Sequence, residues 1–335
     1  MSSRVYRYLA VAVVVIACVL LYVGKRVGWF EDLMLSLGMS VLVCVLIAVS
    51  MLWILYLTIK GKPAERRVVF LYVGIAVSLP LLMTISLHVP ISTEGQLLYD
   101  GMKQIQPDSK VLVSFDYDPP SAPELQPMAI AFLRYCFEHD IKVIIMGLWP
   151  QGPQQANLAL TKLLAEQDIA AKNLTYGVDY VNLGFQSGNE FVIQRMGSDF
   201  KSMFPTDYRG TPYDSLPLVR SIKNYSGIDY SFNLSAGYPG TREWVLIAVD
   251  RFGLVLGAGN TAVQTTGMYP YVRSGQLKGI LGGMSGAAEI EELTERLGKG
   301  AKFMVAQSFG HLVMIVFIVI GNVAYFMHER KRKKV

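Results

Sequence analysis

Long apolar stretches free of Asp, Glu, Lys and Arg alternate with polar segments along the chain. Four of them, at about 8–24, 33–59, 68–89 and 303–327, are long enough for a helix to cross a bilayer, because about 20 apolar residues span a hydrocarbon core about 30 Å thick. The first is near the lower limit of length. The pattern predicts four transmembrane helices, three of them in a membrane region over 1–89.

The segment between the third and fourth predicted helices, 90–302, has a different pattern. Short runs rich in Val, Ile and aromatic residues recur there, and amphipathic stretches at 124–139 and 154–167 follow the first two runs. This alternation is typical of an α/β fold with a largely parallel sheet. We expect a Rossmann-like, mostly parallel sheet domain inserted between transmembrane helices three and four of a four-helix membrane anchor. The expected strands are 110–115, 141–146, 180–185, 230–234 and 244–249.

Composition agrees with a membrane protein that carries a folded domain. Of the 335 residues, 52% are hydrophobic and only 17% are charged, which is too apolar for an ordinary soluble enzyme. Three cysteines are too few for a disulfide framework or a cysteine-rich metal domain. We therefore expect the core of 90–302 to form by hydrophobic burial alone.

Basic residues cluster beside the predicted membrane helices. They occur within 4–7 and 60–67, and they make up the whole of 330–334. Lys and Arg in short flanking segments mark the cytoplasmic side. We expect a multi-pass cell-membrane protein with both termini cytoplasmic, a basic cytoplasmic tail at 328–335 and an extracytoplasmic domain. The net charge of +5 then reflects membrane topology and contact with the lipid bilayer, and no nucleic-acid partner is expected.

Polar and aromatic residues follow the expected strands. In open α/β sheets, ligands bind at the carboxyl ends of the strands, which share one edge when the strands are parallel. We expect a ligand-binding cleft at that edge, although the same residue types also cap helices and form turns. The candidate residues are Asp116, Asp118, Trp149, Gln151, Gln186, Ser187, Asn189, Tyr238 and Asp250.

Signals for catalysis are weak. Ser187, Asp116 and Asp118 are the catalytic candidates, but Ser187 is not in a G-x-S-x-G turn. The histidine of the domain, His139, is expected to cap a helix end rather than act as a base, and Cys136 falls on an apolar helix stripe. Asp116, Asp118 and Asp250, at the ends of expected strands, could hold a hard cation such as Mg²⁺, but spacing alone is weak evidence for such a site. We expect no metal and no cofactor.

Two segments, 253–260 and 279–286, are rich in glycine. Neither matches a phosphate-binding motif after a strand. Close packing of the backbone against the sheet or against a partner explains such spacing better. We therefore expect a protein partner, or a homo-oligomer, that contacts the transmembrane helices and the segment 279–286.

These observations favour a membrane-anchored protein whose extracytoplasmic α/β domain binds a ligand or a partner protein without catalysis. One alternative is an extracytoplasmic hydrolase with a cleft at the carboxyl ends of the strands. Another is an accessory subunit of a membrane transport or export complex. The lack of a well-placed histidine base favours the first hypothesis over the hydrolase.

Overall fold

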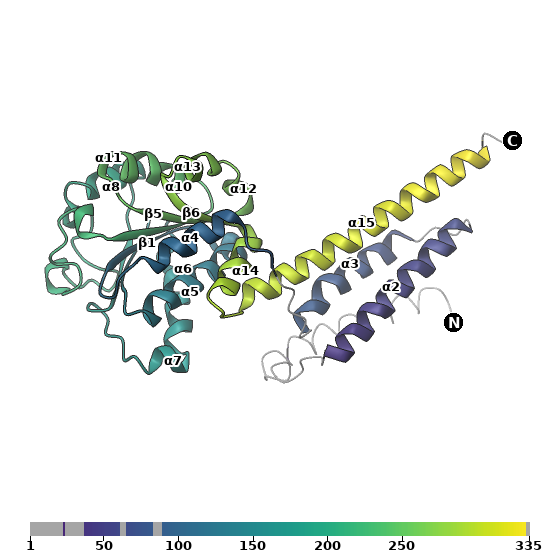
Figure 1. The fold of residues 1–335 in the computed structure, drawn as a ribbon, viewed down its shortest axis with the longest axis horizontal. Coiled ribbons are helices and arrows are strands. Elements are labelled where there is room, and N and C mark those ends of the chain that lie inside the picture. Colours follow the sequence, from purple (N-terminus) through teal and green to yellow (C-terminus); the bar gives the residue numbers. More distant parts are fainter. Residues whose placement is uncertain (1–22, 24–36, 61–64, 83–88, 333–335) are drawn as a thin grey trace. The chain divides into compact units, whose positions relative to one another are not determined.

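The computed structural model describes residue 23 and residues 37–60, 65–82 and 89–332 (Figure 1). The chain divides into two compact units, one of them His88–Met304 and the other formed by the segments on either side of it. The first predicted transmembrane helix, 8–24, lies almost entirely outside the described residues.

The domain is built on a six-stranded sheet in the order β3-β2-β1-β4-β5-β6. Every neighbouring pair is parallel, which confirms the α/β prediction. This is the strand order of doubly wound folds. Strands β2 and β3 are added on one side of β1, and strands β4 to β6 are added on its other side. The strands are β1 (Lys110–Asp116), β2 (Lys142–Gly147), β3 (Tyr180–Phe185), β4 (Tyr230–Ser235), β5 (Leu256–Asn260) and β6 (Leu277–Gly282).

Helices cover both faces of the sheet (Figure 1). Alternate strand residues point to opposite faces, so Val111 and Val113 join one hydrophobic core while Leu112 joins the other. The first core is covered by α4 (Thr93–Lys103), α5 (Ala122–Glu138), α6 (Gly152–Leu164), α7 (Gln167–Ala170) and α14 (Gly283–Leu293). The second lies under α8 (Glu190–Met196), α9 (Phe200–Met203), α10 (Thr241–Trp244), η5 (Val245–Val249) and α13 (Tyr269–Arg273).

Short helical turns complete the connections between these elements. On the side of the second core are α11 (Asp250–Phe252) and α12 (Ala262–Thr265) (Figure 1). The 3-10 turns are η2 (Pro119–Ser121), η3 (Tyr213–Ser215) and η4 (Tyr225–Gly227). Two residues separate β1 from the turn η2, which leads into α5, so two prolines lie between the first strand and that helix.

The predicted strand 244–249 is wrong, because this run continues α10 as the π-helical turn η5. Its buried residues are Trp244, Val245, Ile247 and Ala248, which is helical spacing, while Leu246 is exposed. A short run that is apolar throughout does not distinguish a buried strand from a buried helix. The two strands that sequence analysis missed, β5 and β6, are the glycine-rich segments.

Two buried glutamates of α14 accept hydrogen bonds from residues near the two ends of the domain. Glu289 accepts hydrogen bonds from Ser92 N at 3.3 Å and Ser92 Oγ at 2.6 Å, just before α4. Glu291 accepts from the backbone N–H groups of Gly298, Gly300 and Ala301 at 2.8–2.9 Å, at the start of α15 (Lys299–Arg332). A carboxylate at a helix start satisfies N–H groups that have no partner within the helix.

The second unit contains α2 (Leu37–Ile59), α3 (Arg66–Ser78), η1 (Leu79–Leu82) and most of α15. Among the described residues, two helices are long and apolar enough to cross a membrane, over Leu42–Ile59 and Lys299–Met327. The described part of the third predicted span, 68–89, is helical over α3 and η1, and 83–88 lie outside the described residues. The four-helix anchor is thus supported only for its second and fourth helices.

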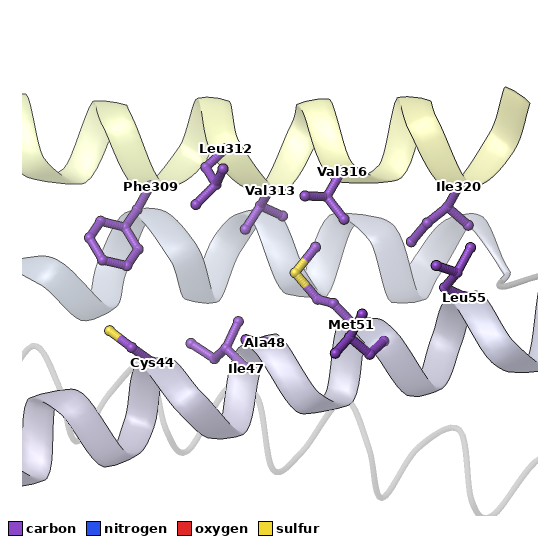
Figure 2. Close-up of a pocket in the computed structure, with 11 residues that line it drawn as sticks. Cys44, Ile47, Ala48, Met51, Leu55, Phe309, Leu312, Val313, Val316 and Ile320 are labelled. Carbon is purple, nitrogen blue, oxygen red and sulfur yellow. The ribbon is translucent and has the colours of Figure 1, made fainter. Parts of the chain in front are cut away.

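An apolar groove of about 490 Å³ lies between α2 and α15 within this unit (Figure 2). Met51 and Leu55 line it from α2, and Val313 and Val316 line it from α15. Met51 and Val313 also pack with Ala76 of α3 in a small hydrophobic cluster. The three helices therefore share one apolar interface.

Candidate functional site

Asp116, the last residue of β1, lies at the centre of a buried hydrogen-bond network. Its Oδ1 accepts from Leu148 N at 2.7 Å. Its Oδ2 accepts from Ser114 Oγ at 2.8 Å, Asn233 Nδ2 at 2.7 Å and Trp244 Nε1 at 3.1 Å. One carboxylate thus connects β1, the end of β2, β4 and α10.

The electrostatics of Asp116 follow from this burial. The side chain is fully buried, and burial raises the pKa of its carboxyl to about 6, whereas the four hydrogen bonds lower that pKa by stabilising the carboxylate. Both oxygens already have protein donors. A carboxylate held in this way organises the carboxyl edge of the sheet, and its oxygens are not open to a substrate or a cation.

A second layer of polar side chains continues the network from β4 to β5. The Thr241 hydroxyl lies 2.6 Å from Asn233 Oδ1 and 2.7 Å from Asn260 Oδ1, and all three residues are buried. Sequence analysis missed them. The signal was present, since Ser114, Asn233 and Asn260 are polar residues in the carboxyl halves of three neighbouring strands. Ser114 pairs with Asn233, and Asn260 pairs with Ser235, two residues further along β4.

Hydrogen bonds near the surface connect the loops that follow β2, β3 and β4. Trp149 donates from Nε1 to the Pro239 carbonyl at 2.9 Å. The Tyr238 hydroxyl lies 2.7 Å from both carboxylate oxygens of Glu190, at the start of α8. This bond to Glu190 raises the pKa of Tyr238. The predicted residues Trp149 and Tyr238 therefore lie on connected loops.

The other predicted residues of this edge are exposed or half-buried. Ser187 and Gln151 are exposed, and Gln186 and Asn189 are half-buried. Asn189 has a φ of 50°, in the left-handed region that asparagine tolerates better than most residues. Among the described residues, the Asp118 carboxyl accepts one hydrogen bond, from the Ser121 hydroxyl at 2.9 Å.

Within the described part of the domain, the structure does not bring a histidine to Ser187. His139 follows the last residue of α5, and its Nδ1 lies 2.8 Å from the Tyr135 carbonyl. The adjacent Asp140 carbonyl accepts from Asp108 N, just before β1, so His139 lies near the amino edge of the sheet. The expected helix-capping role is confirmed, and Cys136 is buried in the core as expected.

Asp250 does not belong to the carboxyl edge, contrary to the sequence prediction. It begins α11 and accepts from Gln276 Nε2 at 2.7 Å, one residue before β6 begins. That position is the amino end of a parallel strand. The error follows directly from the assignment of 244–249 as a strand.

Exposed apolar and aromatic side chains also lie at or just after the carboxyl ends of β3, β4 and β5. Phe185 ends β3, Phe191 follows Glu190 in α8, and Val263 follows β5. Their exposed fractions are 40%, 65% and 83%, and that of Tyr238 is 59%. Sequence analysis missed Phe185, Phe191 and Val263. We call Phe185, Phe191, Tyr238 and Val263 the aromatic rim, although Val263 is aliphatic.

No family model matches the chain, and neither the curated proteins nor the solved structures gave a match.

The loop after β1 does not fit a dinucleotide, although the strand order is that of dinucleotide-binding folds. Such sites place glycines and a helix start against the pyrophosphate. Here the loop is Asp116-Tyr117-Asp118-Pro119-Pro120, so two carboxylates and two prolines occupy that position. Among the described residues, no group of three or more His, Cys, Asp or Glu side chains is arranged to hold a metal ion.

Proposed function

We propose that this chain is a multi-pass membrane protein whose extracytoplasmic α/β domain binds a partner protein through the aromatic rim. The observation that carries the proposal is an exposed set of apolar side chains above a fully hydrogen-bonded Asp116. The network fixes the loops, and the rim offers contact surface. Aromatic side chains are enriched at protein interfaces, and clustered exposed apolar side chains mark interaction sites.

The proposed anchor has four membrane helices, at 8–24, 33–59, 68–89 and 303–327. Two helices that can span a membrane support it, as does the packing of α3 against both of them. The basic residues of 60–67 and 330–334 place these segments in the cytoplasm by the positive-inside rule. With four crossings, the domain lies outside the cytoplasm.

This topology predicts the labelling, by a membrane-impermeant maleimide, of two variants that each carry one added cysteine. Asn173→Cys changes an exposed residue of the domain, and Val335→Cys changes the last residue of the chain. We expect Asn173→Cys to react in intact cells and Val335→Cys to react only after permeabilisation. The parent chain, whose own cysteines remain, gives the background. Reaction at Val335→Cys but not at Asn173→Cys in intact cells would place the domain in the cytoplasm.

The binding surface can be tested by placing a photo-crosslinking phenylalanine analogue at Phe191 in native membranes. Val178, which is 40% exposed and precedes β3 at the amino edge, is the matched control position. We expect a defined protein adduct from Phe191 at least about fivefold stronger than from Val178, and weakened about tenfold by Tyr238→Ser, because few interface residues carry most of the binding energy. Equal adducts at both positions would refute the rim as a protein interface. An adduct with a small molecule alone would indicate a ligand site.

A further inference from the structure

A cavity of about 420 Å³ lies on the face of the domain covered by α5 and α6. Its walls come from α5, α6 and the first turns of α15, and we call it the α5–α6–α15 cavity. Pro123, Ile130, Leu158 and Phe303 give it an apolar lining. A volume of this size is in the range of small-molecule and lipid sites.

Only some of the charged groups that line this cavity have partners of opposite charge or hydrogen-bond donors. Arg134 is bound by both carboxylate oxygens of Glu166, at 2.8 and 2.9 Å. Glu291 is occupied by the three N–H groups at the start of α15. Lys162 and Lys299 also line the cavity, and neither ammonium group forms a hydrogen bond or ion pair with another described residue.

The two lysines are close enough to repel each other. Burial first, and then the like charge of Lys299, lower the pKa of Lys162. An anion between the two ammonium groups would relieve this repulsion. An apolar lining beside two unpaired cations is complementary to a molecule with an apolar chain and an anionic head.

We propose that the α5–α6–α15 cavity binds one anionic phospholipid, with its phosphate between Lys162 and Lys299 and part of an acyl chain along the apolar lining. The source of this ligand follows from the chain itself. Lys299 and Phe303 belong to the first turns of α15, and the apolar span of that helix begins at Lys299. The residues of the cavity are therefore continuous with a helix that can enter the bilayer, and this inference rests on the proposed membrane anchor.

The experiment uses the full chain in a neutral detergent and measures bound lipid by native mass spectrometry. The probes are phosphatidylglycerol and phosphatidylcholine with the same acyl chains. We expect one phosphatidylglycerol to bind at least about tenfold more tightly than phosphatidylcholine. The double variant Lys162→Ala/Lys299→Ala should lose this preference, with phosphatidylglycerol binding weakened about thirtyfold, since each basic residue contributes about fivefold.

Two comparisons make the result specific. Arg220→Ala/Lys223→Ala removes two exposed basic residues from the segment that packs on the other sheet face, and it should bind phosphatidylglycerol as the parent chain does. Leu158→Trp fills the cavity at a residue that is 56% exposed and should also weaken binding. Unchanged urea midpoints of unfolding confirm that the variants fold.

Several results would contradict the proposed lipid site. Equal binding of the two lipids, or equal loss in both double variants, would overturn the proposal. If inorganic phosphate, at the same concentration as the lipid phosphate, displaces the bound lipid, the cavity binds free anions and the proposal is also overturned. Carbonate extraction of the parent chain from membranes tests the anchor by itself. A chain that stays in the membrane but lacks the lipid preference would contradict the lipid site and leave the proposed anchor intact.

Discussion

Replacing Asp116 with alanine is expected to lower the free energy of unfolding by about 3–5 kcal/mol. The substitution leaves four buried donors, on Ser114, Leu148, Asn233 and Trp244, without their acceptor. Each unsatisfied buried group costs about 1–3 kcal/mol, and removal of the desolvated charge offsets part of that sum. The measurement is proteolysis of the detergent-solubilised full chain across a urea series.

The matched control is Asp118→Ala, two residues further along the same loop. Asp118 is half-buried and its carboxyl accepts one hydroxyl, so we expect a change below about 1 kcal/mol. If the two variants lose equal stability, the network around Asp116 does not hold the carboxyl edge together.

The stability difference between the parent chain and Asp116→Ala should depend on pH. The folded-state pKa of Asp116 is about 6, above the ordinary value of 3.8, so between these values the folded chain retains a proton that the unfolded chain has released. Protonation of this carboxyl therefore adds stability that is complete below about pH 4 and lost as pH rises through 6. The difference should widen by up to about 3 kcal/mol from pH 7 to pH 4. If the stability difference instead narrows from pH 7 to pH 4, the hydrogen bonds lower the pKa of Asp116 by more than burial raises it.

The sequence predicts the centre of the sheet better than its far edge. Strands β1 to β4 are runs rich in Val, Ile, Phe and Leu, and each observed strand agrees with its prediction to within one residue at either end. Strands β5 and β6, in contrast, contain Gly257, Gly259, Gly279 and Gly282, and glycine is depleted in strands because it adds no packing and costs backbone entropy. Their glycines are required by contacts with distant segments, which sequence spacing does not reveal.

The candidate site was predictable in outline only. Parallel strands bring their carboxyl ends together, so Asp116, Trp149 and Tyr238 could be grouped from the sequence. The hydrogen bonds that occupy Asp116 could not, because Trp244 reaches it from a segment that was expected to be a strand. Nor could the exposure of Phe191, since an isolated aromatic residue in a sequence is more often buried than exposed.

Gly279→Ala should destabilise the chain by more than about 3 kcal/mol, the second large effect that we expect. Gly279 lies in β6 with a φ of 154°, and a Cβ there would lie 2.1 Å from Leu98 N, 2.5 Å from Leu98 Cα and 2.7 Å from Glu94 O. All three atoms belong to the backbone of α4, which cannot move aside as a flexible side chain can. The methyl group therefore has to displace the whole helix from the sheet.

The displacement of α4 gives this prediction a second readout. Gly257 lets the same helix approach β5, where a Cβ would lie 2.5 Å from Leu98 Cδ1, so α4 has no alternative position at this depth. Amide exchange across 93–103 should therefore accelerate in Gly279→Ala, together with the loss measured by urea unfolding. Gly267→Ala is the control, because its Cβ meets only Gln264 O at 3.6 Å, and it should change stability by less than about 1 kcal/mol. Equal stability of Gly279→Ala and Gly267→Ala would mean that the contact between α4 and β6 is looser than described, and the glycine-rich strand would then need another explanation.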